Sequence, residues 1–240
     1  GWTGMKWDPL PPGGLRLSPR EMRYVVEQLR AVREAVGDDV DLLVEAHYRL
    51  DPATAIELAS QIEPFRPFVL EDPVPMDSLD ALAKVAAKVR IPISTDRSPT
   101  KWGWWPILER QLVDIAQPDV VHVGGILEFK KIAAMAEARY ISVAPHNPNG
   151  PVATAASLQL ALNLPNFLIQ EMPAYDRKWR TPWREDMLVD PTPVTVKNGF
   201  LEAPTAPGLG VDLNEAMIAK HPFVIQPWGP RHDSAEAILD

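Results

Sequence analysis

Cysteine is absent from the 240 residues of this sequence. Its absence excludes disulfide bonds, zinc sites built on thiolates and cysteine nucleophiles. No apolar run approaches the ~18 residues that a membrane-spanning helix needs, and the first residues show no signal-peptide pattern. The 24 Lys and Arg and 32 Asp and Glu give a net charge of −8, which disfavours nucleic acid and anionic membranes as partners. We therefore expect a cytoplasmic protein that binds neither.

Glycine-rich nucleotide fingerprints are missing too, because the two glycines at 124–125 alone make no dinucleotide-binding motif or P-loop. The first 175 residues instead alternate between short β-rich runs and amphipathic helical stretches. The expected strands are residues 3–7, 41–44, 68–70, 91–94, 120–123, 140–144 and 167–170. The expected helices are residues 19–36, 52–62, 79–89, 107–112, 129–139 and 153–162. The first helix has clear limits, with Ser18 and Glu21 as a capping box, Pro19 at its first position and Gly37 after its end.

This alternation predicts a parallel sheet with helices outside it. Seven strands with a repeat of about 25 residues favour a (β/α)8 TIM-type barrel over an open doubly wound sheet. A closed barrel needs eight strands, and an open one would expose two long edges. We therefore expect that the N-terminal part of the parent protein, including the first barrel strand, lies outside this chain. Residues 1–185 are the expected barrel domain, and residues 186–240 form a C-terminal segment that packs on it.

Acidic or histidine residues stand at or near the ends of successive expected strands. They are Glu45, Glu71, Asp96, Asp119, His146 and Glu171. The C-terminal ends of barrel strands converge on one mouth, where barrel enzymes keep their active sites. A single acid at such a place is usually a helix cap or an ion-pair partner, but six in register favour one shared site. Three carboxylates from neighbouring strands suit Mg²⁺, and a histidine two strands further on suits a general base.

Short motifs around these residues resemble those of the enolase superfamily, mandelate racemase branch, and most closely its galactonate and gluconate dehydratases. The matching segments are residues 44–47 (VEAH), 70–73 (LEDP), 117–119 (QPD), 124–126 (GGI), 144–148 (APHNP), 169–171 (IQE) and 206–210 (APGLG). They cover nearly the whole chain in order. The resemblance also implies an N-terminal capping domain, which we expect to lie outside this chain together with the first strand.

The resemblance implies a metal site and a base. Glu45, Glu71 and Asp96 would bind one Mg²⁺, and His146 would abstract the α-proton of a carboxylate substrate, with Asp119 holding its ring. The third ligand departs from the family pattern, because Asp96 stands where a Glu is usual and its carboxylate reaches about 1.5 Å less far. The longer Glu45, where Asp is common, is a possible compensation.

Further roles follow from the same resemblance. His47 would be the general acid that protonates the departing hydroxyl, and Glu171 would contact the substrate carboxylate or the enolate. Lys6 is a candidate substrate contact. Arg97 is either a substrate contact or an ion-pair partner of its neighbour. His122, in the middle of the expected strand 120–123, is expected to be a core or barrel-interior histidine.

The implied activity is Mg²⁺-dependent dehydration of a sugar acid to a 2-keto-3-deoxy acid. Two alternatives remain at this point. One is a racemase or epimerase of a carboxylate substrate, which needs a base on each face of the substrate. The other is a non-catalytic, truncated homologue, for which Asp96 and the missing cap are the evidence. The expected partners are a small-molecule acid sugar and further copies of the same chain.

Overall fold

The computed structural model describes residues 1–96, 98, 100–173 and 185–222. The described chain divides into two compact units, and each is treated by itself. The first contains residues 1–96 and 107–115, and the second contains residues 98, 100–106, 116–173 and 185–222. Arg97, a predicted site residue, lies outside the described residues.

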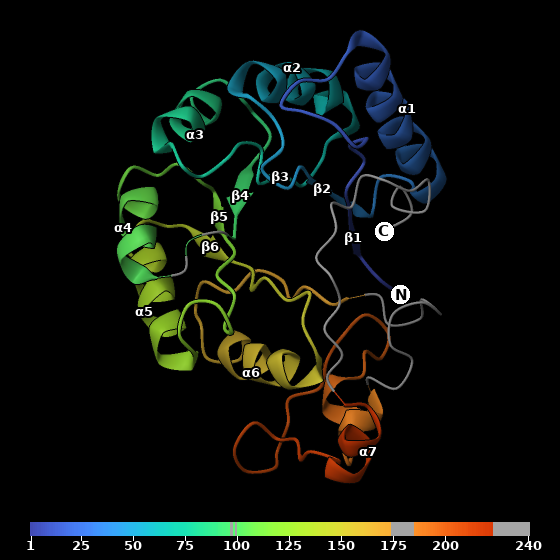
Figure 1. Ribbon diagram of the computed structural model, residues 1–240, viewed down its shortest axis with the longest axis vertical. Coiled ribbons are helices and arrows are strands. Elements are labelled where there is room, and N and C mark those ends of the chain that lie inside the picture. Colours follow the sequence, from blue (N-terminus) through green and yellow to red (C-terminus); the bar gives the residue numbers. More distant parts are fainter. Residues whose placement is uncertain (97, 99, 174–184, 223–240) are drawn as a thin grey trace. The chain divides into compact units, whose positions relative to one another are not determined.

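The first unit alternates strands and helices in sequence order (Figure 1). Its elements are β1 (Gly4–Trp7), α1 (Pro19–Val36), β2 (Asp41–Glu45), α2 (Pro52–Ile62), the 3₁₀ turn η1 (Glu63–Phe65), β3 (Val69–Glu71), α3 (Leu79–Ala86) and β4 (Ile93–Thr95). The four strands pair in parallel and neighbour one another in the order of the sequence. An order without reversal is that of a barrel, whereas a doubly wound sheet reverses at a switch point.

Helix α1 shows how local sequence sets an element. The Ser18 side chain accepts a hydrogen bond from the Glu21 N–H, and the Glu21 carboxylate accepts one from the Ser18 N–H, at 2.7 Å. Gly37 follows the last turn with φ of 76°, a conformation that favours glycine. Met22, Val25 and Leu29 form the buried stripe of the helix, as the predicted spacing requires.

The strands of the first unit bring two carboxylates side by side. Leu42, Val44 and Leu70 are fully buried, because helices and loops cover both faces of a parallel sheet. The register pairs Glu45, the last residue of β2, with Glu71, the last residue of β3. Their neighbouring positions therefore follow directly from strand pairing.

The second unit continues the pattern. Helix α4 (Lys101–Glu109) and strand β5 (Ile115–Ala116) contain residues of both units, and α5 (Ile126–Glu137), β6 (Ser142–Val143) and α6 (Pro151–Ala161) follow. The Ala144 N–H donates to the Ala116 carbonyl at 3.0 Å, which joins the end of β6 to β5. The helix predicted at 107–112 begins earlier, at Lys101.

The predicted strand at 120–123 is wrong. The strand lies earlier, at Ile115–Ala116, and residues 120–123 form a turn. The Asp119 carbonyl accepts hydrogen bonds from the His122 and Val123 N–H groups at 3.0 and 2.9 Å, and its side chain accepts one from the Val121 N–H at 2.8 Å. An aspartate that binds the backbone ahead of it initiates a turn, and here this outweighs the strand preference of the valines.

The strand predicted at 167–170 is reduced to one parallel bridge, between Phe167 and Val143. The Leu168 N–H still donates to the Val143 carbonyl at 2.9 Å. Beyond this bridge, Glu171 accepts hydrogen bonds from Asn147, in the loop that follows β6.

The C-terminal segment contains the 3₁₀ turns η2 (Glu185–Met187) and η3 (Thr192–Val194) and helix α7 (Glu215–Lys220). Leu188 and Val194 pack in one buried cluster with Ala155 of α6. At Gly210 φ is 79°, and a Cβ would lie 2.4 Å from the Cβ of Pro204, so this turn requires glycine. Within the residues described, no helix is long and apolar enough to cross a membrane.

Candidate active site

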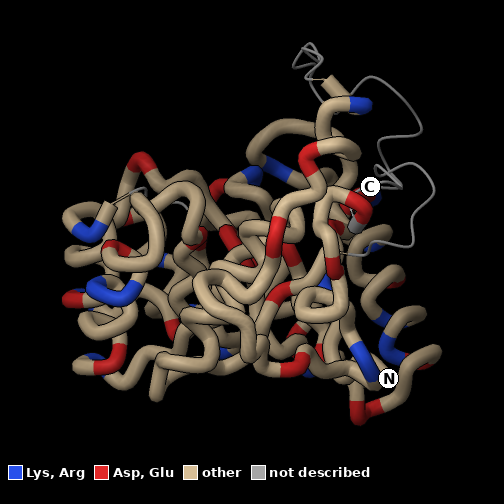
Figure 2. Tube along the Cα trace, turned by 90° about the horizontal axis from the view of Figure 1, so that it is seen from below, with Lys and Arg blue, Asp and Glu red and all other residues tan. Residues whose placement is uncertain are grey.

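Three buried carboxylates gather at the ends of β2 and β3. Glu45, Glu71 and Asp72 each offer one oxygen, and these three atoms lie within 4.8 Å of one another. The Lys6 ammonium lies 2.8 Å from a Glu71 oxygen and 4.0 Å from a Glu45 oxygen. Figure 2 shows acidic residues on chain segments in the middle of the view as well as on the helices. Burying carboxylates is costly unless a cation compensates them, and Lys6 supplies one positive charge.

The electrostatics of this cluster favour a further cation. Burial raises the pKa of Glu45 well above its usual range, and the neighbouring Glu71 and Asp72 charges raise it further. Burial, with the Glu71 charge, also raises the pKa of Asp72 to about 8. All three donors are oxygen atoms, as hard divalent cations prefer. The residues present therefore fit a hard divalent metal ion.

Asp72 is a member of the cluster that the sequence pattern did not single out as a ligand. Its φ is 48°, an uncommon value for a residue other than glycine. That backbone turn keeps its side chain beside Glu71 instead of on the opposite face of the strand. The only signal in the sequence was its position directly after a predicted ligand.

Asp96, the third predicted ligand, does not belong to this group. Its side chain accepts a hydrogen bond from the Tyr48 hydroxyl. Its backbone N–H donates to an Asp72 oxygen at 3.3 Å. The structure thus brings together two of the three predicted ligands, Glu45 and Glu71, and connects the third to them through Asp72.

His47 follows β2 on a turn of left-handed residues. Its φ is 47° and that of Tyr48 is 60°, conformations that persist only where surrounding contacts impose them. The His47 N–H donates to a Glu45 oxygen at 2.6 Å, and Nδ1 lies 2.8 Å from an Asp8 oxygen. Asp8 also pairs with the Arg49 guanidinium. The sequence pattern did not reveal this partnership, because Asp8 and His47 belong to different strand ends.

In the second unit, Asp119 and His146 form a hydrogen-bonded pair. His146 Nδ1 lies 2.9 Å from an Asp119 oxygen. The Asn149 amide donates to the same oxygen at 2.8 Å, and the Val121 N–H donates to the other at 2.8 Å. Burial alone would raise the pKa of Asp119, but the hydrogen bonds from His146, Val121 and Asn149 outweigh it and lower that pKa. An ionised carboxylate holding a histidine by Nδ1 is the arrangement of a general base.

His122 is not the core histidine that the sequence suggests. Its side chain is 59% exposed, and Nδ1 lies 3.6 Å from an Asp119 oxygen. Its ring centroid is 6.3 Å from that of His146. The turn at 120–123 places it there, whereas in a strand its side chain would stand on one of the two faces of the sheet.

Glu171 holds the loop that follows His146. One of its carboxylate oxygens accepts a hydrogen bond from the Asn147 N–H at 2.8 Å, and its carbonyl accepts one from the Asn147 amide at 3.1 Å. The same amide donates to Thr154 at 2.9 Å. Asn147, which is buried, thus connects Glu171 to helix α6 and to the loop that follows His146.

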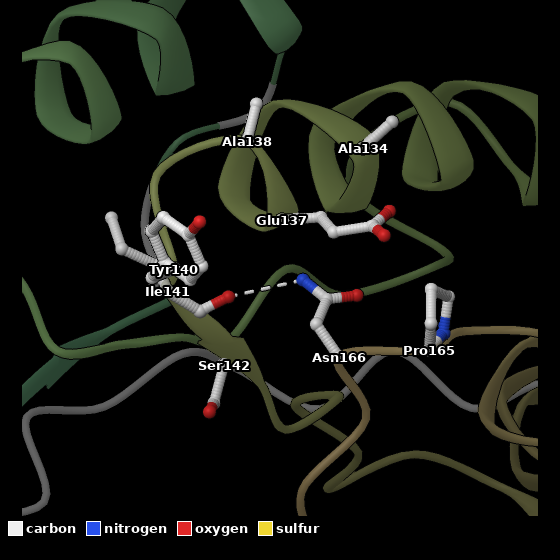
Figure 3. A pocket seen from close by; sticks show the side chains of 8 residues that line it. All are labelled: Ala134, Glu137, Ala138, Tyr140, Ile141, Ser142, Pro165 and Asn166. Carbon is white, nitrogen blue, oxygen red and sulfur yellow. Dashed lines mark hydrogen bonds between the residues drawn. The ribbon is translucent and has the colours of Figure 1, made fainter.

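Two cavities in the second unit differ in their relation to these residues. One, of about 570 Å³, is mostly apolar and is lined by Val121, Ile126, Val152 and Asn149 among others. Through Asn149 it adjoins the carboxylate that holds His146. The other, of about 640 Å³, lies at the start of β6, and in it the Asn166 amide donates to the Ile141 carbonyl at 3.0 Å (Figure 3).

The cavity beside Ile141 and His146 lie at opposite ends of one strand. Ile141 precedes β6 and His146 follows it. In barrel enzymes the N-terminal ends of the strands serve stability and the C-terminal ends catalysis.

Comparisons with known proteins extend over nearly the whole chain. A family model described as "Enolase C-terminal domain-like" matches residues 1–217. D-gluconate dehydratase from Thermoproteus tenax is 33% identical over 223 residues, which are 92% of this chain and 44% of that protein. D-xylonate dehydratase from Haloferax volcanii is 36% identical over 229 residues, 92% of this chain and 54% of that protein. The chain thus spans about half the length of these curated relatives.

A solved structure agrees with the same grouping. The mandelate racemase/muconate lactonizing enzyme from Jannaschia sp. CCS1 superposes with a TM-score of 0.86 and 37% identity, covering 94% of this chain and 57% of that one. These findings confirm the predicted TIM-type barrel class and the resemblance drawn from the motifs.

Proposed function

Because the chain belongs to the enolase C-terminal domain-like family, we propose that it is the barrel part of a Mg²⁺-dependent dehydratase of sugar acids. The observation that carries the proposal is the Asp119–His146 pair, a carboxylate-held base at 2.9 Å. Two curated relatives, dehydratases of gluconate and xylonate, support the substrate class. Residues 1–185 would be the barrel domain, and residues 186–240 a segment packed against it.

Glu45 and Glu71 are the proposed metal ligands, supported by their adjacent strand ends and common cluster. The sequence pattern favours Asp96 as the third ligand. Asp72 is the alternative, because its carboxylate lies beside those of Glu45 and Glu71. What a bound Mg²⁺ supplies is positive charge that offsets the second negative charge developing on the substrate carboxylate.

His146 is the proposed base. Its Nδ1 is held by the ionised Asp119, so the α-proton of the substrate would pass to Nε2, on the other side of the ring. The bond between the α-carbon and its hydrogen breaks, and the electron pair moves into the carboxylate to form an enediolate. Asp119 stabilises the imidazolium that results, as carboxylate partners of catalytic histidines do. Glu171 and Asn147 position the loop that carries His146.

His47 is the proposed acid. Its Nδ1 is held by Asp8 at 2.8 Å, so Nε2 would deliver the proton to the hydroxyl at the β-carbon. The carbon–oxygen bond breaks as the enediolate electron pair returns, water leaves, and the enol tautomerises to a 2-keto-3-deoxy acid. Lys6 and Arg97 are proposed substrate contacts, as is Glu171. The Lys6 ammonium also balances the charge of Glu71.

A substrate panel tests the proposal. The complete protein would be incubated with gluconate, xylonate and galactonate, with Mg²⁺ or with a chelator, and assayed for 2-keto-3-deoxy products. We expect product from at least one acid, only with Mg²⁺, and none from the Glu71→Gln variant. Epimerised substrate without elimination would instead establish a racemase or epimerase. Product formation that persists in chelator would refute the metal requirement.

A further inference from the structure

Asp119 lies between two imidazoles, of which the proposed reaction uses one. Its Oδ2 is 2.9 Å from His146 Nδ1 and 3.6 Å from His122 Nδ1. One ligand atom from each residue can be chosen so that the three lie within 4.8 Å of one another. We propose that Asp119, His122 and His146 form a binding site for a divalent transition cation of the Zn²⁺ type, in addition to the site for Mg²⁺.

The donor set selects the kind of cation. Imidazole nitrogen suits Zn²⁺, Co²⁺, Ni²⁺ and Cu²⁺, whereas carboxylate oxygen suits Mg²⁺. Two histidines with one carboxylate are a known zinc ligand set that leaves a position open. The acidic cluster at Glu45 and Glu71 has only oxygen donors, so the two sites differ in the metal they prefer.

The distances suit a tetrahedral ion after small movements. Zinc bonds to nitrogen and oxygen of about 2.0–2.1 Å place neighbouring tetrahedral ligands about 3.3 Å apart. The two separations from Asp119 Oδ2, 2.9 and 3.6 Å, fall on either side of that value. His122 is exposed, so its side chain can rotate towards a metal without repacking the core.

The Asp119 carboxylate is held in place by hydrogen bonds that leave it able to bind a cation. Asp119 is fully buried, its other oxygen is held by the Val121 N–H, and the Asn149 amide contacts the shared oxygen. The hydrogen bonds that lower its pKa keep it ionised at neutral pH. Such outer partners orient ligands and strengthen metal binding.

Occupation of this site would inhibit the enzyme, and this consequence rests on the proposed function. A cation bound to His146 Nδ1 takes the place of the proton there, and the neutral ring then carries its proton on Nε2. Nε2 has no lone pair left to accept the α-proton, so α-proton removal slows. Mg²⁺ does not cause this effect, because it binds imidazole weakly compared with Zn²⁺.

Cobalt absorption spectroscopy tests the site without reference to activity. The Glu71→Gln protein would be titrated with Co²⁺, because that change weakens the competing acidic cluster. We expect visible bands of nitrogen-ligated Co²⁺ that saturate near one equivalent and disappear when Zn²⁺ is added. Adding His122→Asn should weaken Co²⁺ affinity by about tenfold or more. His221→Asn is the matched control, because His221 ends α7 and is not in the group, and it should leave the titration unchanged.

Equal Co²⁺ affinity with and without His122 would overturn the proposal, provided circular dichroism shows both proteins folded. In the complete protein at saturating Mg²⁺, we also expect micromolar-to-millimolar Zn²⁺ to inhibit and His122→Asn to relieve the inhibition. Inhibition that is the same in both would refute the link to the base. If the complete protein shows no dehydratase activity, only the proposed function is refuted, because the cobalt titration tests the transition-metal site independently.

Discussion

Replacing His146 by asparagine should abolish both product formation and exchange of the substrate α-proton. A positioned general base contributes about 10²–10⁴-fold to a proton transfer, or about 3–5 kcal/mol of the barrier. Asparagine has no basic nitrogen, so this whole contribution should be lost. The fold should survive, because the His146 side chain is partly exposed, at 14%, and its Nδ1 contacts the carboxylate of Asp119.

The hydrogen bonds behind the base predict a graded series. Asp119→Asn removes a charge-assisted hydrogen bond worth about 1.5–3 kcal/mol, so the rate should fall by about 10–10²-fold. Asn149→Ala removes one of several donors to Asp119, while the Val121 N–H and His146 remain. Its effect should stay below about tenfold. The losses therefore should decrease from His146 through Asp119 to Asn149.

Proton NMR in D₂O distinguishes the two histidines. With the complete protein and a true substrate, His47→Asn should block dehydration while the base and the metal site remain able to exchange the α-proton. His146→Asn should show neither process. Exchange that persists in His146→Asn would mean that another residue is the base, with Lys6 the first candidate. If Asn149→Ala lowered the reaction rate as much as His146→Asn, the predicted order of effects, from His146 through Asp119 to Asn149, would be refuted.

Three further changes probe the metal cluster and the fold. If Asp96 is a ligand, Asp96→Asn should weaken Mg²⁺ binding by at least about tenfold. Tyr48→Phe is the control, because it removes only the hydrogen bond from the Tyr48 hydroxyl to Asp96. Equal Mg²⁺ affinities in calorimetry for Asp96→Asn and wild type would leave Asp72 as the third ligand. Mg²⁺ affinity should rise with pH below pH 8, by up to about tenfold per unit for each proton displaced, because the metal must displace protons that Glu45 and Asp72 retain through their raised pKa values; calorimetry at pH 6 and 8.5 that gives equal affinities would contradict this. Ser18→Ala should lower the free energy of unfolding by about 1 kcal/mol, and an unchanged urea midpoint with an unchanged slope would show that the cap of α1 is immaterial.

Local signals predicted the elements whose limits depend on nearby residues. The capping box at Ser18 and the glycine at 37 set both ends of α1. Strand ends were predictable where an apolar run meets a charge, as at Glu45 and Glu71, and parallel pairing then placed these carboxylates side by side. Helix α4 was harder to place, because Gly103 and Pro106 disfavour a helix and yet lie within it.

Backbone turns and contacts between distant segments decided the rest. The turn at 120–123 formed because Asp119 binds the backbone ahead of it, and this same turn brings His122 beside Asp119. No local pattern pairs Asp8 with His47, since 39 positions separate them. Periodicity places a residue on a face of a strand or helix, but the direction of a side chain after the strand ends depends on backbone angles that only the surrounding contacts impose. Glu45, Glu71 and His146 could therefore be predicted from strand ends, whereas Asp72, His122 and the partners of these residues required the folded chain.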